Sequence, residues 1–151
     1  PYLRIFRPDD WFYAIAMPGQ LYRSRNGLGD FETGPRLTTE PIRHHALLHH
    51  GGQWYLLWTR VGDTPERILL STLNTAADWE QWKLVETFEI HRAQKPWEGA
   101  DMMPRASQYG ASMQRVNQLR DPAIFEESGK IYLLYAVAGE QGIAIGELRK
   151  T

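Results

Sequence analysis

The feature that most constrains this sequence is an internal repeat. The segment Arg43–Gly62 recurs at a constant offset as Arg120–Gly139: the first copy reads RHHALL, a glycine, YLL and a second glycine, and the other reads RDPAIF with the same glycines and the same YLL. A weaker copy opens the chain, where Ile5-Phe6 and Tyr13 take the equivalent places. Repetition of such units is typical of propellers and arrays. Because equivalent strand ends in a propeller surround one axis, we expect the polar residues that begin each copy to face that axis.

Each unit has the pattern of a meander of short antiparallel strands. Aromatic and β-branched runs alternate with turn signals such as Pro8–Asp10, Asn26-Gly27, Gly51-Gly52 and Ser128-Gly129. A turn of helix is expected only within residues 75–82. The predicted strands are residues 2–7, 11–17, 21–24, 45–50, 54–61, 67–72, 83–88, 123–125, 131–138 and 143–148.

Units of about 40 residues have the size of one propeller blade. The sequence therefore predicts an all-β fold, a partial β-propeller of about three antiparallel four-stranded (or three-stranded) blades. We expect a single propeller-type domain over residues 1–151, with blades at approximately 1–40, 41–90 and 118–151. Residues 91–117 are rich in Pro, Gly, Ser and Gln and are predicted to be an insertion loop.

Three blades are too few to close a ring, since propellers have about four to eight. An open ring exposes sheet edges and an apolar face. The sequence begins with Pro1 rather than Met. We therefore expect the ring to be completed by missing blades of a longer parent chain or by a homodimer.

Composition excludes several classes of protein. A chain of 151 residues with 42% hydrophobic content can bury one core and is too short for two ordinary domains. A net charge of -1 gives no electrostatic reason to expect nucleic acid or a membrane surface as partner. There is no cysteine, so disulfides and thiolate metal sites are excluded and the compartment is left open. No apolar run approaches the roughly 18 residues of a membrane span.

Two short motifs resemble those of a known group of enzymes. Arg120-Asp121-Pro122, at the head of an inner strand, resembles the Arg-Asp-Pro motif of five-bladed propeller glycoside hydrolases, which include the family 43 arabinanases and xylosidases and the family 32-type invertase and levansucrase clans. The segment Trp97–Asp101 is similar to the Glu-Gly-Pro-type segment that carries the general acid in family 43. The patterns Ser71–Trp79 and Ser24–Phe31 are similar to the outer-strand pattern of those blades. Over nearly its full length the chain resembles the C-terminal part of uncharacterised bacterial glycosyl-hydrolase-like propeller proteins.

The resemblance implies roles for two carboxyl groups. Glycoside hydrolysis needs an acid that protonates the leaving oxygen and a second carboxylate. Glu98 would be the general acid, and we expect Trp97 and the nearby methionines to raise its pKa by desolvation. Asp121 would orient that acid and modulate its pKa. The structural alternatives are a solvated loop carboxylate for Glu98 and a strand-entry residue before proline for Asp121.

The general base of that family has no counterpart here. It is an aspartate at the head of another inner strand, and the matching positions in this chain are Tyr2 and His44. Asp101 is a carboxylate, but it lies in the same loop as Glu98. The base is therefore expected in a blade outside this chain, or the protein does not hydrolyse glycosides by that route.

Basic residues at two strand heads, with Arg60 at the end of a middle strand, suggest a second activity. Arg43, His44, Arg60 and Arg120 together would form a cationic funnel suited to phosphate or a carboxylated sugar, as in the propeller phosphorylases of family 130. For Arg60 alone, a surface ion pair with Asp63 or Glu66 is the alternative. No His, Asp or Glu cluster has metal-ligand spacing, so neither a metal nor a cofactor is expected.

Aromatic residues complete the candidate site. Trp97 and Tyr109, in the insertion, are predicted sugar-stacking platforms, whereas Trp58 and Tyr22 lie in strand patterns and are expected to pack between blades. Two functional classes follow. One is a carbohydrate-active hydrolase or phosphorylase; the other is a non-catalytic propeller module that binds a glycan or a protein.

Overall fold

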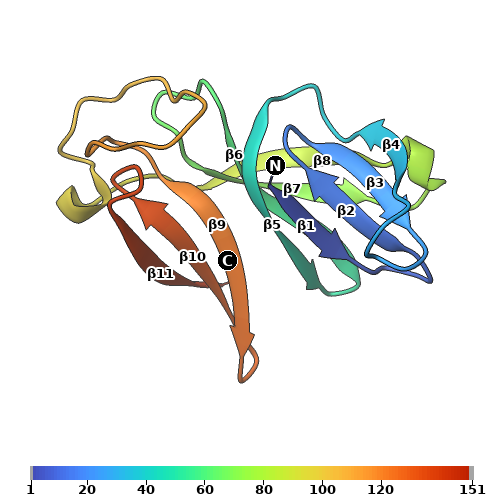
Figure 1. The fold of residues 1–151 in the computed structure, drawn as a ribbon. Coiled ribbons are helices and arrows are strands. Elements are labelled where there is room, and N and C mark those ends of the chain that lie inside the picture. The colour runs from blue at the N-terminus through green and yellow to red at the C-terminus, as the bar shows by residue number, and fades with distance from the viewer. Residues whose placement is uncertain (1, 150–151) are drawn as a thin grey trace.

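The computed structural model describes residues 2–149, and its regular structure is almost entirely β-strand (Figure 1). Pro1, Lys150 and Thr151, which the domain prediction includes, lie outside the described residues. Two short 3-10 turns occur, η1 (Trp79–Gln81) and η2 (Pro96–Glu98). The strands are β1 (Leu3–Phe6), β2 (Phe12–Ala16), β3 (Gln20–Ser24), β4 (Glu32–Arg36), β5 (Ile42–His50), β6 (Gln53–Arg60), β7 (Ile68–Asn74), β8 (Lys83–His91), β9 (Arg120–Glu127), β10 (Lys130–Val137) and β11 (Gly142–Leu148).

The strands form three antiparallel sheets of consecutive strands, β1–β4, β5–β8 and β9–β11. The chain is thus a partial β-propeller, as the repeat predicts. The inner strands β1, β5 and β9 lie beside one another in chain order, and the long connection between β8 and β9 arches over one end of the third sheet (Figure 1).

The sequence repeat is also a repeat of strand register. Ile5 pairs with Ala14, Leu47 with Leu56, and Ile124 with Leu133, so equivalent residues pair in all three sheets. Two of the hairpins turn through two residues of positive φ, Gly51-Gly52 and Ser128-Gly129, as the twist of the flanking strands favours. The same turn chemistry therefore sets the same register in two copies.

Strand β4 is not among the strands that the sequence predicts. Strand β4 contains the sequence ETGPR, and Gly and Pro are both unfavourable in strands. It forms because β4 is the edge of the first sheet, where proline needs no ladder partner on its outer side. The segment also packs close to η1: a Cβ at Gly34 would collide with the Trp79 ring.

The core lies in two layers between the sheets. Leu56 faces the first layer with Tyr13, Ile15 and Leu21 from the first sheet. Leu57, the next residue of β6, faces the second layer, which the third sheet lines with Leu133, Tyr135 and Val137. Both leucines are completely buried because the second sheet is covered on both faces.

Both repeated strand heads contain a register irregularity. Between Ile42 and His45, β5 contains one more residue than the facing part of β6. Between Arg120 and Ala123, β9 likewise contains one more residue than the facing part of β10, and Asp121 has φ 50°. Bulges of this kind redirect side chains and are frequent beside functional sites. Here they lie at Arg43-His44 and at Arg120–Pro122.

Candidate functional site

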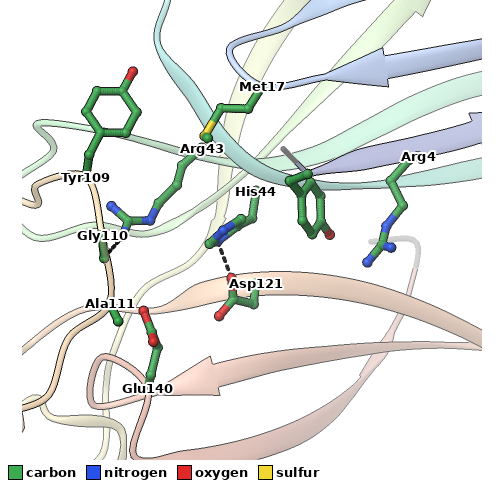
Figure 2. A pocket seen from close by; sticks show the side chains of 10 residues that line it. Arg4, Met17, Arg43, His44, Tyr109, Gly110, Ala111, Asp121 and Glu140 are labelled. Atoms are coloured by element: carbon green, nitrogen blue, oxygen red, sulfur yellow. Dashed lines mark hydrogen bonds and ion pairs between the residues drawn. The ribbon is translucent and has the colours of Figure 1, made fainter.

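A cavity of about 520 Å³ opens where the heads of β5 and β9 meet the start of the first sheet. Its lining includes Tyr2, His44 and Asp121, which are the equivalent positions of the three repeats. Figure 2 shows His44 and Asp121 facing each other. Residues 109–111 of the insertion and Glu140 cover another side. The prediction that the strand heads of all three copies face one place agrees with this geometry.

The polar centre of the cavity is a contact between two of these residues. His44 Nδ1 and Asp121 Oδ1 form an ion-pair contact, with both side chains partly exposed (Figure 2). The Tyr2 ring lies 4.9 Å from the His44 ring, and its hydroxyl donates a 2.9 Å hydrogen bond to the His45 carbonyl. Burial raises the pKa of Tyr2, although the Arg4 guanidinium 4.5 Å above its ring opposes this. The site thus presents an imidazole, a carboxylate and a phenol ring within one hollow.

Arg43 and Arg120 are buried and bind protein groups. The Arg43 guanidinium donates to the carbonyl oxygens of Gln108 and Gly110. Arg120 donates to the Gly110 carbonyl at 3.3 Å and to Glu140 at 2.7 Å. Arg43 lines the cavity, whereas Arg120 lines a neighbouring cavity of about 270 Å³ behind residues 109–112.

Arg60 lies elsewhere. It donates to Asp63 at 2.7 Å and to Glu40 at 3.0 Å and is absent from the lining of both cavities. Of the two alternatives for this residue, the pair with Asp63 is formed and the pair with Glu66 is not. The four basic residues therefore do not converge as one open funnel, because carboxylates and carbonyls already occupy the three guanidiniums.

Glu98 is enclosed and does not line the cavity. Its Oε1 accepts a 2.8 Å hydrogen bond from the Tyr135 hydroxyl and lies 2.8 Å from His91 Nε2. Its Oε2 accepts from the backbone N–H groups of Gln94 and Lys95 at 2.8 and 2.9 Å. The side chain is 2% exposed.

The expected pKa shift of Glu98 is wrong in sign. Burial acts to raise its pKa, but the hydrogen bonds from Gln94, His91, Tyr135 and Lys95 outweigh it, and the pKa lies below its ordinary value. Trp97 and Met103 are themselves exposed, and the carboxylate oxygens are bound by hydrogen-bonding groups. Its two side-chain partners, which the sequence did not single out, come from the end of β8 and from β10. No local motif marks them, since they meet only when the two sheets pack.

The segment around Glu98 has a structural explanation. Glu98 ends η2 and bonds back to the N–H of Lys95, which is a capping arrangement. Gly99 follows with φ 96°, and a Cβ there would collide with the Val116 carbonyl. Asp101 is exposed and pairs with Arg115 at 2.8 Å. The Glu-Gly pair is therefore required by the chain path of the insertion.

The aromatic candidates separate into two groups. Trp58 is buried between sheets and donates to Ser71 at 3.0 Å, and Tyr22 is half-buried in β3. Tyr109 is 60% exposed and lines both cavities. Trp97 is also exposed but lies outside the cavity lining. Tyr109 is thus the predicted platform that the fold places at the site.

Within residues 2–149, no three His, Cys, Asp or Glu side chains are grouped so that they could hold a metal ion. In the same range, none of the helices has the length and apolar character needed to cross a membrane.

The sequence is similar to that of a viral protein. No protein-family model matches the sequence. An uncharacterised protein of Acanthamoeba polyphaga mimivirus is 36% identical over 165 aligned positions, covering 99% of this chain and 46% of the viral protein. The chain thus spans about half the length of the curated relative that it matches.

Among solved structures, the chain is similar to an α-L-arabinanase of Cellvibrio cellulosa, with a TM-score of 0.66 and 16% identity over 98% of this chain and 47% of that one. An endo-1,4-β-xylanase of Bacteroides thetaiotaomicron gives a TM-score of 0.67 at 16% identity, covering 96% and 47%. A thermostable family-43 glycoside hydrolase gives 0.69 at 15% identity, covering 96% and 48%. At this level of identity the likeness establishes the propeller fold.

Proposed function

We propose that this chain forms part of a carbohydrate-active β-propeller and that its cavity binds a sugar residue of a glycan. The observation that carries the proposal is the convergence of Tyr2, His44 and Asp121, the equivalent heads of three inner strands, on one cavity. The structural neighbours with arabinanase and xylanase activity support the substrate class.

The chemistry of the lining suits a sugar. The Asp121 carboxylate and the His44 imidazole can exchange hydrogen bonds with vicinal hydroxyl groups. Tyr109 and Tyr2 offer ring faces beside these polar groups, which is how a small number of polar groups and aromatic walls bind a small ligand. A free volume of about 520 Å³ lies within the usual range of ligand pockets.

The geometry favours binding over complete catalysis by these residues alone. Hydrolysis needs two carboxyl groups on opposite sides of the glycosidic bond, and Asp121 faces the cavity whereas Glu98 is enclosed by four hydrogen-bonding groups. In this proposal Asp121 is the carboxylate that contacts the sugar. The general acid role of Glu98 stays a prediction that its glutamine variant tests. Glu140, the other carboxylate of the cavity lining, accepts a 2.7 Å hydrogen bond from Arg120.

The test is calorimetric titration with arabinohexaose and with a xylo-oligosaccharide of the same length. We expect one of them to bind, and we expect Asp121→Asn and His44→Ala each to raise the Kd at least about tenfold, a loss of about 1.4 kcal/mol. Asp10→Asn, in the exposed turn before β2, is the matched control and should bind as the wild type does. Unchanged affinity in the Asp121 variant would place the glycan elsewhere.

We also propose that further propeller blades cover the two open ends of this chain. Leu3 and Ile5 are exposed on the outer face of the first sheet. Phe125, Ile143 and Ile145 are exposed on the far face of the third sheet, where they share one side with Tyr132 and Leu134. Solved propellers of this fold are about twice as long as the part that this chain covers, which points to blades rather than to an unrelated partner.

Light scattering after size exclusion tests the docking surface. We expect the 151-residue chain alone to self-associate heterogeneously with rising concentration, and Ile143→Lys with Ile145→Lys to reduce this. A discrete dimer that the double variant dissociates would assign the surface to a second copy instead. A monodisperse monomer at all concentrations would contradict any docking at these faces.

A further inference from the structure

Glu66 is a completely buried carboxylate that touches neither cavity. It lies between two guanidiniums: Arg120 Nε is 3.2 Å from Oε2, and Arg43 Nε is 3.8 Å from Oε1. Both arginines are themselves almost inaccessible to solvent. One negative charge thus joins the head of β5 to the head of β9, which lie in different sheets.

Each of these arginines directly precedes a residue of the cavity. Arg43 is followed by His44, and Arg120 is followed by Asp121. The backbone of Glu66 holds the same region, since its carbonyl accepts a 3.0 Å hydrogen bond from the N–H of Leu119. The heads of β5 and β9 are therefore joined twice, by the His44–Asp121 contact and by the two contacts of Glu66.

The same arginines hold the wall of the cavity. Arg43 donates to the carbonyl of Gly110 (Figure 2) and to that of Gln108, and Arg120 also donates to the carbonyl of Gly110. Tyr109 lies between these two carbonyls and lines both cavities. Arg43 and Arg120, which contact Glu66, thus also hold the backbone on either side of Tyr109.

Burying the Glu66 carboxylate between two guanidiniums costs desolvation free energy. Stability alone therefore does not explain this cluster. Burial raises the pKa of Glu66, against the opposing effects of the Thr59 hydroxyl, Arg43 and Arg120. Arginine stays charged in proteins, and a buried ion pair is often no more stable than apolar residues of similar volume. Within residues 2–149, Arg43 has Glu66 as its carboxylate partner, whereas Arg120 also has Glu140.

We propose that Glu66 is a positioning residue: it orients Arg43 and Arg120, which in turn set the His44–Asp121 pair and the Tyr109 segment that form the cavity. Glu66 does not touch the ligand. The loss of its charge acts mainly through Arg43, because Arg120 keeps Glu140. This inference rests on the proposed function only for its ligand measurement.

The experiment compares Glu66→Gln with the wild type by three readouts. The first is the ring ¹⁵N signal of His44 in long-range NMR spectra, which reports the contact with Asp121. The second is amide exchange of Ser107 and Gly62, which are hydrogen-bonded between the insertion and the β6–β7 connection. The third is titration with arabinohexaose.

We expect the His44 signal of Glu66→Gln to move toward that of Asp121→Asn, exchange at Ser107 to quicken at least about tenfold, and the Kd to rise at least about tenfold. Asp63→Asn is the matched control, since Asp63 is a neighbouring buried carboxylate that pairs with Arg60 and Arg67 instead. It should leave the His44 signal unchanged. The same His44 shift in both variants, or in neither, would overturn the proposal.

A second variant covers the case in which Glu66→Gln does not fold. Arg43→Met with Glu66→Leu removes one charge of each sign and leaves Arg120 with Glu140. It should fold and still show the altered His44 signal and the faster exchange. A folded double variant with wild-type values in both would overturn the proposal. If the wild type binds no probe, only the glycan proposal fails, because the first two readouts need no ligand.

Discussion

Glu66 and Glu98 are two buried carboxylates that each contact both the second and the third sheet, and they are neutralised in different ways. Glu66 faces two permanent positive charges at 3.2 and 3.8 Å. Glu98 accepts hydrogen bonds from two backbone N–H groups and a tyrosine and contacts a histidine. Burial raises the pKa of Glu66, whereas for Glu98 burial is outweighed by the hydrogen bonds and its pKa is lowered. At Glu98 the hydrogen bonds thus outweigh burial, whereas at Glu66 burial outweighs the Thr59 hydroxyl and the two guanidiniums.

The difference also separates two kinds of task. Glu98 closes the turn that contains it through Gln94 and Lys95, and its other oxygen contacts His91 of β8 and Tyr135 of β10. Glu66 connects segments that are distant in the sequence and stand behind the cavity. Four predictions test this comparison, from the largest expected effect to the smallest.

The largest effect is expected for Glu66→Leu, which leaves Arg43 buried without a carboxylate. Removing one partner of a buried ion pair typically costs about 3–5 kcal/mol of unfolding free energy. Urea denaturation measures this. The charge-balanced variant Arg43→Met with Glu66→Leu should recover most of the loss, and a double variant as unstable as the single one would refute the electrostatic account.

Glu98→Gln should destabilise the protein by about 1–3 kcal/mol, because an amide has one acceptor oxygen where the carboxylate has two. Its NH₂ must replace an acceptor either of the Gln94 and Lys95 N–H groups or of the Tyr135 hydroxyl. The melting temperature and the turnover of an aryl glycoside are measured together. An unchanged melting temperature with abolished turnover would support the general acid role instead.

The two glutamates should respond to pH with opposite signs. The folded-state pKa of Glu98 lies below its ordinary value of 4.5, so its stabilising contribution is full above that pH and is lost as the pH falls through the folded pKa. The folded-state pKa of Glu66 lies above 4.5, so the penalty for its ionisation grows as the pH rises through that value. The stability of the wild type relative to Glu98→Gln should therefore shrink in acid, and relative to Glu66→Gln it should grow. Urea denaturation curves recorded about every pH unit from about pH 3 to about pH 8 measure both differences. Parallel pH dependences of the two differences would contradict the opposite pKa shifts of Glu66 and Glu98.

The smallest effect is expected for Tyr135→Phe, which removes one of the four groups around Glu98. A single hydrogen bond to a buried carboxylate is worth about 1.5–3 kcal/mol, and His91 remains beside the same oxygen, so we expect a loss near the lower end. The carboxyl ¹³C titration of Glu98 should move toward higher pH. No movement would show that His91 and the backbone alone set its pKa.

Several features of the site follow from the sequence because they are carried by the repeat. The alignment of the three copies predicts that Tyr2, His44 and Asp121 are equivalent, and a propeller brings equivalent strand heads together. The exposed ring of Tyr109 follows from its position in a segment without strand periodicity. Both inferences depend only on chain symmetry and on local composition, which can be read from the sequence.

What the sequence determined by itself is the all-β partial propeller, because hydrophobic alternation and paired turn signals are local and recur in register. Tertiary structure alone decided which charges meet. Glu66 has no sequence relation to Arg43 or Arg120, and His91 has none to Tyr135. Nothing local therefore predicts that burial prevails at Glu66 and raises its pKa, whereas hydrogen bonds prevail at Glu98 and lower its pKa. The physical reason is that burial and charge partners depend on the packing of one sheet against the next, which short-range sequence patterns do not encode.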